Sequence, residues 1–177
     1  MIRSRNEIAA MATSAARGAG IVLGHAEDFG PVVAHMAAHN PSGLSCLAAV
    51  LECPSRPIAM RSDGDGLLIA KAQVIFAAPI AIDMIKSGVK RVQLSDLDAP
   101  ALLAAYCEAA GGIVCSQNGD LYEVSPLVVS APPNAVQATE FPDEIWGILS
   151  GFAAQTYVPA SEASRLSGAG AGLHDND

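Results

Sequence analysis

Apolar residues recur every three or four positions along the first part of the chain, as they do on one side of an α-helix. In the first segment these positions are Ile8, Met11, Ala12 and Ala15. Ser4 precedes them and Glu7 follows three residues later, which is the pattern of a capping box. Gly18 and Gly20 come next and permit the left-handed backbone angles that end helices. The pattern predicts a first helix over about residues 5–17.

Two more helices are predicted before residue 54. The second begins near Gly24 or His25, and Pro31 lies early enough to be tolerated in its first turns or to kink it. Asn40-Pro41 ends this helix and starts a third, which Cys53-Pro54 ends. Their apolar sides consist of Phe29, Val32, Val33 and Met36 in the second helix and of Leu44, Leu47, Val50 and Leu51 in the third.

Two β-hairpins are predicted in the middle of the chain. The turn of the first is the acidic, glycine-containing segment Ser62–Gly66, and the turn of the second is Asn118-Gly119. The flanking strands are Ile58–Arg61 and Leu67–Ala70 in the first hairpin and Ile113–Ser116 and Leu121–Val124 in the second. Both hairpins point to a sheet that is at least partly antiparallel.

The segment between the two hairpins has one ambiguous part. In residues 72–87, Val74 and its neighbours favour a strand, whereas the stretch from Pro79 onward favours a helix that ends at Gly88. Val89–Ser95 alternates between apolar and polar residues and is predicted to be a strand. A helix that starts at Asp98 or Pro100 and ends at Gly111-Gly112 follows.

The last third of the chain is predicted to contain a short strand and a helix. The strand is Leu127–Ser130, and the helix begins near Pro142, with Ile145, Trp146, Leu149 and Phe152 on its apolar side. A helical turn over Ser161–Ser167 and a tail of alternating glycine and alanine come last.

These elements predict one α+β domain over residues 1–177. Its parts are a helical segment over 4–53, a mixed α/β segment over 56–140, and a C-terminal helix with a Gly-rich tail over 142–177. Strands and helices alternate too irregularly for a doubly wound parallel sheet. We therefore expect a mixed β-sheet covered by Ala-rich helices.

Composition agrees with a single domain whose core consists of small side chains. Hydrophobic residues make up 51% of the 177 residues, but aromatic residues only 5%. Such a chain is long enough to bury a core without disulfides or a metal. Its weakly charged, Ala-rich surface is compatible with self-association.

Charge and hydropathy limit the partners. The net charge of -8 disfavours nucleic acid, because a negative chain repels phosphates. The most apolar stretch, residues 72–82, is too short to span a bilayer and contains Pro79. We expect a cytoplasmic protein that binds neither nucleic acid nor membranes.

The cysteines predict no metal centre or catalytic thiol. They are Cys46, Cys53, Cys107 and Cys115. Their spacing matches neither C-x-x-C nor a zinc ribbon, and no histidine lies near Cys107 or Cys115 in the sequence. We expect small buried thiols in a reducing compartment.

His35 and His39 lie four residues apart on the second helix, and Asp28 lies seven residues before His35, so the three side chains could share one metal ion. No glutamate stands between the histidines in the metalloprotease pattern, and no fourth ligand is evident. We therefore expect a solvated polar face and no metal.

Two glycine-containing motifs are also expected to be structural. Gly18, Gly20 and Gly24 follow a helix, whereas the glycines of a dinucleotide-binding fingerprint follow a strand. The segment from Asp63 is too short for a calcium loop and has Val74 at its twelfth position instead of glutamate. No cofactor is predicted.

Both ends of the chain resemble an uncharacterised bacterial family known only as a domain of unknown function. The N-terminal residues that carry the resemblance are Asn6-Glu7, Ala15–Gly20 and Ala26–Asp28. At the C-terminus they are Tyr157-Val158-Pro159, Ser161-Glu162, Ser164-Arg165, Gly168–Gly172 and Asp175–Asp177. The resemblance implies no activity.

We predict a candidate site where the C-terminal tail folds back against the first two helices, so that arginine on one segment faces carboxylates on the other. Glycine-rich backbone can also bind an anion. The candidate residues are Arg17, Glu27, Asp28, Glu162, Ser164, Arg165, Gly168, Gly170 and Asp175.

Two functions follow as hypotheses. The first is an accessory or binding protein that self-associates and is not catalytic. The second is a small enzyme for an anionic metabolite, with Arg17 and Arg165 holding a carboxylate or phosphate and an acidic residue acting as acid or base.

Overall fold

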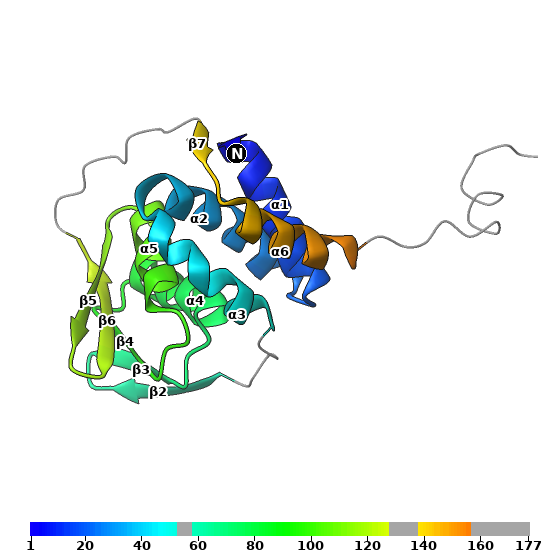
Figure 1. Ribbon diagram of the computed structural model, residues 1–177. Coiled ribbons are helices and arrows are strands. Elements are labelled where there is room, and N and C mark those ends of the chain that lie inside the picture. Colours follow the sequence, from blue (N-terminus) through cyan, green and yellow to red (C-terminus); the bar gives the residue numbers. More distant parts are fainter. Residues whose placement is uncertain (53–57, 128–137, 157–177) are drawn as a thin grey trace, which may run out of the picture.

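The computed structural model describes residues 1–52, 58–127 and 138–156, and confirms the α+β fold class. A five-stranded sheet lies at one side of the molecule (Figure 1). Helices α4 and α5 pack between that sheet and α2, and α1 lies on the other side of α2 together with α6. The helices thus form successive layers behind one face of the sheet.

The first helix, α1 (Arg5–Gly18), has the predicted capping box. The Glu7 backbone N–H donates to Ser4 Oγ at 3.2 Å, and the Ser4 backbone N–H donates to Glu7 Oε2 at 2.8 Å. Helix α2 (Leu23–His39) contains Pro31, as predicted. The predicted third helix begins as the 3₁₀ helix η1 (Pro41–Cys46) and continues as α3 (Leu47–Glu52).

The capping box makes the stability of α1 depend on pH. Hydrogen bonds from the Ser4 hydroxyl and backbone N–H hold the pKa of Glu7 below its ordinary value of 4.5. This stabilisation is present above pH 4.5 and is lost as pH falls through the lowered pKa. We expect Glu7→Gln to melt below the wild type at pH 7, and this difference to shrink as pH falls through the lowered pKa of Glu7, as measured by circular dichroism.

A Ser4→Ala background provides the control, because it removes the hydroxyl that acts most strongly on Glu7. In that background Glu7→Gln should have a smaller effect at pH 7. An equal effect in both backgrounds would contradict the capping-box origin.

The sheet has the strand order β2-β3-β4-β6-β5. Its strands are β2 (Ala59–Asp63), β3 (Gly66–Ala70), β4 (Val92–Ser95), β5 (Ile113–Asn118) and β6 (Leu121–Pro126). Both predicted hairpins form, since β2 pairs antiparallel with β3 and β5 with β6. Strand β4 pairs parallel with β3 and antiparallel with β6, so the sheet is mixed, as predicted.

The ambiguous segment is the helix α4 (Val74–Lys86), and α5 (Pro100–Ala110) follows β4 as predicted. Most of the α4 side chains are buried, because the sheet covers one side of this helix and α2 and α5 cover others. A helix covered on several sides has no clear apolar stripe, which explains the ambiguity. Asp98 Oδ1 accepts a hydrogen bond from the Val74 N–H at 2.9 Å, so the start of α4 is held by a residue from beyond β4.

A second, two-stranded sheet was not predicted. Strands β1 (Ile2–Ser4) and β7 (Ala138–Glu140) pair antiparallel, with Arg3 opposite Thr139. Three residues are too few to display an alternating pattern. Of the predicted strand Leu127–Ser130, only Leu127 lies within the described residues, and it is not part of a strand.

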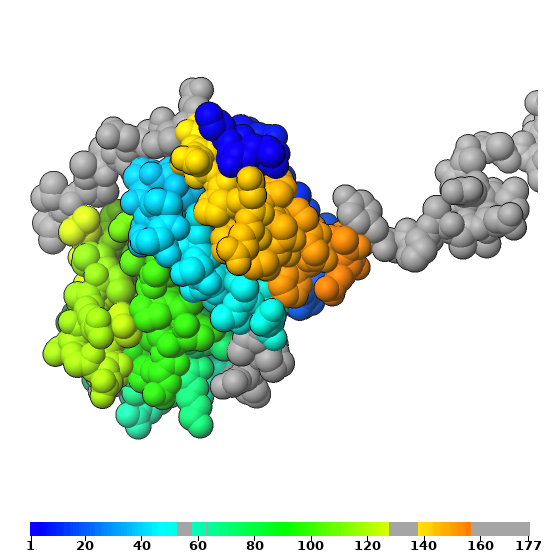
Figure 2. Space-filling view, viewed as in Figure 1, coloured from blue at the N-terminus to red at the C-terminus, as the bar shows by residue number. Residues whose placement is uncertain are grey.

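Helix α6 (Asp143–Ala154) is the predicted helix after Pro142 and packs against α1. Figure 2 shows α6, in yellow and orange, on the surface beside the blue N-terminal residues. The predicted turn over 161–167 and the tail lie outside the described residues. Among the residues that the structure describes, no helix is long and apolar enough to cross a membrane.

Candidate functional site

The structure describes three of the nine predicted site residues. Arg17 lies near the end of α1, and Glu27 and Asp28 lie in the first half of α2. All three are exposed, and no ion pair joins Arg17 to either carboxylate. Glu162, Ser164, Arg165, Gly168, Gly170 and Asp175 lie outside the described residues, so docking of the tail stays a prediction.

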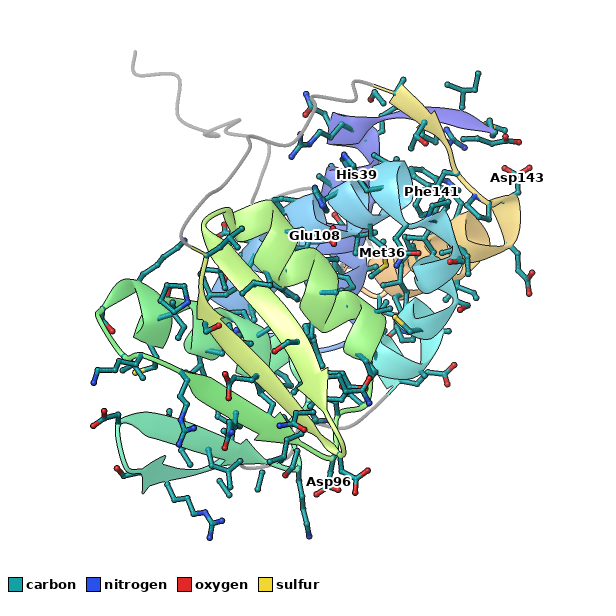
Figure 3. All side chains as sticks on the ribbon, turned by 90° about the vertical axis from the view of Figure 1, so that its left-hand side faces the viewer. Met36, His39, Asp96, Glu108, Phe141 and Asp143 are labelled. Atoms are coloured by element: carbon teal, nitrogen blue, oxygen red, sulfur yellow. The ribbon has the colours of Figure 1, made fainter. Side chains whose placement is uncertain are left out.

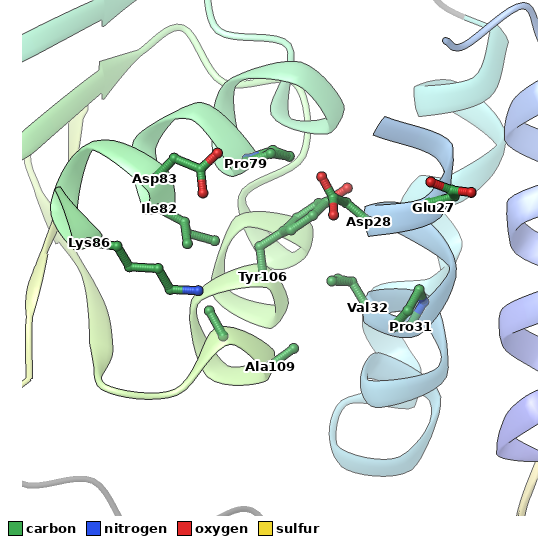
Figure 4. A pocket seen from close by; sticks show the side chains of 11 residues that line it. Glu27, Asp28, Pro31, Val32, Pro79, Ile82, Asp83, Lys86, Tyr106 and Ala109 are labelled. Atoms are coloured by element: carbon green, nitrogen blue, oxygen red, sulfur yellow. The ribbon is translucent and has the colours of Figure 1, made fainter. Parts of the chain in front are cut away.

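Glu27 and Asp28 line a pocket between α2, α4 and α5 (Figure 4). Its volume is about 240 Å³. A pocket of this size has room for one small organic molecule. The walls are apolar and consist of Pro31, Val32, Pro79, Ile82, Ala109 and Ala110.

Tyr106 is the most unusual polar residue of the pocket. Its side chain extends from α5 toward Asp28, and the residue is only 3% exposed (Figure 4). The hydroxyl oxygen is buried and has no hydrogen-bond partner among the described residues. Burial raises the pKa of this phenol above its usual range, and the Asp28 carboxylate raises it further. The hydroxyl is therefore neutral, and leaving it unpaired costs about 1–3 kcal/mol.

The charged groups of the pocket are mainly acidic. Asp28 and Asp83 contribute two carboxylates and Lys86 one ammonium group, whereas the carboxylate of Glu27 points away from Tyr106 (Figure 4). Asp83 and Lys86 lie three residues apart in the last turns of α4, and Lys86 extends toward α5 (Figure 4). The pocket is thus apolar inside with a negative balance of charge, which favours a ligand that carries a positive group.

A second polar cluster joins α2 to α5. His35 is 4% exposed, and its Nε2 lies 3.1 Å from Glu108 Oε2. His39 Nδ1 lies 3.0 Å from the His35 carbonyl oxygen, and the two rings stack with centroids 4.2 Å apart. Figure 3 shows His39 and Glu108 on the facing helices. The expectation of a solvated face was wrong for His35, because α5 covers it.

Neither of these clusters forms a metal centre in the described ranges. No group of three or more histidine, cysteine, aspartate or glutamate side chains there is arranged to hold an ion. Asp28 faces the pocket, whereas His35 pairs with Glu108, so the three residues considered from the sequence serve two different places.

Three polar residues that line the pocket are absent from the site predicted from the sequence: Tyr106, Asp83 and Lys86. One signal was available: two opposite charges three residues apart mark a polar side on an otherwise apolar helix. The buried hydroxyl gave no signal, because a tyrosine in a core helix has the same pattern.

Comparison with known proteins gives a family without an activity. No curated protein matches the chain. The family model that matches is described as "Protein of unknown function (DUF3726)" and covers residues 3–75, which include α1, α2 and the first hairpin. The pocket therefore receives Glu27 and Asp28 from the matched part, and Tyr106 and Lys86 from beyond it. The predicted resemblance to a family of unknown function is confirmed over residues 3–75 of this chain.

Proposed function

We propose that the protein is a non-catalytic binding protein for a small organic cation, with the pocket between α2, α4 and α5 as its site. The observation that carries this proposal is the buried Tyr106 hydroxyl, which has no partner in the described part of the chain and points toward the Asp28 carboxylate. A protonated amine can donate hydrogen bonds to both oxygens at once. The binding of such a group would satisfy the hydroxyl and offset its burial cost.

The rest of the pocket defines the size and shape of the ligand. Its volume of about 240 Å³ lies just below the usual range for drug-sized ligands, about 300–1,000 Å³, so the ligand is small. The apolar walls favour an aliphatic body next to the amine. Lys86 also lines the pocket and can bind a carboxylate at the other end of a zwitterionic ligand.

The test is thermal unfolding in the presence of short alkylamines, with the corresponding alcohols and carboxylic acids as comparison ligands. An amine at ten times its dissociation constant stabilises the folded state by about 1.4 kcal/mol, which raises the melting temperature by several degrees. We expect Asp28→Asn to abolish this increase and Tyr106→Phe to reduce it. The control is Asp120→Asn, an exposed aspartate in the β5–β6 turn outside the pocket, which should leave the increase unchanged.

The same screen tests the hypothesis of a small enzyme for an anionic metabolite. Lys86 is the observation that favours it, because its ammonium group is available to bind a carboxylate or phosphate in the pocket. Stabilisation by carboxylic acids that is lost in Lys86→Met, with none by amines, would replace the cation proposal by that hypothesis. No stabilisation by any ligand class would contradict both.

Self-association is a second proposal, and the two edges of the five-stranded sheet support it. Strands β2 and β5 are the edge strands of the sheet. Each has an exposed apolar side chain: Met60 is 50% exposed and Val114 is 37% exposed. The unpaired backbone N–H and C=O groups of an edge strand can pair with a strand of another chain. Light scattering after size-exclusion chromatography measures the mass directly, and a monomer at all concentrations would contradict this proposal.

A further inference from the structure

Two cysteines from neighbouring elements lie in direct contact. Cys107 is on α5 and Cys115 is on β5, two elements that pack against each other, and their thiols share a side-chain hydrogen bond. Between them the chain turns through Gly111 and Gly112, both with φ of 65°. Because L-residues with a side chain rarely adopt this angle, the two glycines permit the sharp return from α5 to β5 that brings the thiols together.

The two thiols differ in solvent access. Cys107 is 1% exposed, whereas Cys115 is partly exposed on β5. A thiol that reacts with a dissolved molecule must be accessible to solvent. A second thiol that attacks the oxidised first sulfur only has to contact that sulfur. Cys115 therefore suits the first step of a reaction and Cys107 the second.

The hydrogen bond also distinguishes the protonation states of the pair. Its acceptance by the Cys115 sulfur lowers the pKa of Cys115, and its donation, together with burial, raises the pKa of Cys107. The pair thus favours a Cys115 thiolate beside a protonated Cys107. The thiolate is the reactive form of cysteine.

We propose that Cys115 is a site of oxidation by hydroperoxides and that Cys107 resolves the product into an intramolecular disulfide between α5 and β5. In the first step the Cys115 thiolate attacks the terminal peroxide oxygen, and the O–O bond breaks. Cys115 becomes a sulfenic acid, and the peroxide is reduced to water or an alcohol. In the second step the Cys107 sulfur attacks the sulfenic sulfur, the S–O bond breaks, and the Cys107 proton leaves with the hydroxide as water. The net reaction converts two thiols and one peroxide into one disulfide and two hydroxyl compounds.

The thiol pair includes a residue of α5, the helix that also lines the pocket, but its oxidation does not depend on the proposed ligand. Tyr106 precedes Cys107 in α5, and Ala109 and Ala110 follow it in the pocket wall. A disulfide would fix this part of α5 to β5. The thiol pair can therefore be tested without any pocket ligand.

The experiment treats the reduced full-length protein with hydrogen peroxide at pH 7 and maps the products by mass spectrometry. We expect a Cys107–Cys115 disulfide as the first product, with the loss of two hydrogens. Cys46 is the internal control, because burial raises its pKa whereas the hydrogen bond from Cys107 lowers the pKa of Cys115. Cys115 should therefore be alkylated faster than Cys46.

Two variants separate the steps. Cys107→Ser should leave Cys115 as a sulfenic acid that dimedone traps, and Cys115→Ser should leave Cys107 reduced. The wild-type mapping stands even if a variant fails to fold. Oxidation of Cys46 as fast as Cys115, or the absence of the Cys107–Cys115 disulfide from the wild type, would overturn the proposal.

Discussion

Replacement of Gly18 by alanine is expected to lower the free energy of unfolding by about 3 kcal/mol. A Cβ on Gly18 would lie 1.8 Å from the Phe152 carbonyl oxygen and 2.6 Å from its carbon. These are backbone atoms of α6, so no side-chain rotation removes the overlap, and the two helices must move apart. The sequence analysis assigned Gly18 to the end of a helix, but its main role is this close approach of α1 to α6.

Gly151→Ala provides the matched control for this prediction. Gly151 is exposed on α6, and a Cβ there meets nothing within 4 Å. In such a position alanine stabilises a helix by about 0.5–1 kcal/mol relative to glycine. Urea unfolding of both variants measures the difference, and equal free energies of unfolding would show that α1 and α6 are not in close contact.

Phe141→Ala is expected to have the other large effect, a loss of about 3–5 kcal/mol. Phe141 is 1% exposed and packs edge-on against Trp146, with ring centroids 5.8 Å apart. Its backbone N–H also donates to the Met1 carbonyl oxygen at 2.9 Å. Removal of the ring would leave a cavity where the small sheet, α6 and the helical core meet.

A nearby exposed residue and a double mutant test the origin of this effect. Ile2 lies on β1 and is 76% exposed, so Ile2→Ala should change the free energy of unfolding by less than about 0.5 kcal/mol. In a double-mutant cycle with Trp146→Ala, the aromatic pair should contribute about 0.5–1.5 kcal/mol. A loss below about 1 kcal/mol for Phe141→Ala would mean that this ring is not part of the core.

Local signals explain which elements could be predicted from the sequence. The capping box at Ser4 and the Asn118-Gly119 turn are short-range patterns, and both form as expected. Helix α4 was ambiguous because neighbours from distant parts of the chain cover it. The insertion of β6 between β4 and β5 depends on pairing between distant strands, which periodicity does not encode.

The candidate site likewise contains residues that the sequence could identify and residues that only the fold brings together. Glu27 and Asp28 were selected because they are titratable residues beside a recognisable motif, and both line the pocket. The polar residue nearest to Asp28 in Figure 4 is Tyr106 instead of an arginine, because α5 packs against this side of α2. A contact between two helices that are far apart in sequence decides which groups face each other, so chemistry along one helix could identify only half of the site.

The contact between Gly18 and Phe152 also bears on how the protein is made. The two residues are 134 positions apart, the difference between their numbers. At about 5–20 residues per second, a ribosome needs roughly 7–27 s to pass from one to the other. Throughout that interval the part of α1 around Gly18 has no α6 to pack against. We expect nascent chains that stop before residue 143 to bind chaperones, and chains that extend well past residue 154 to be released from them.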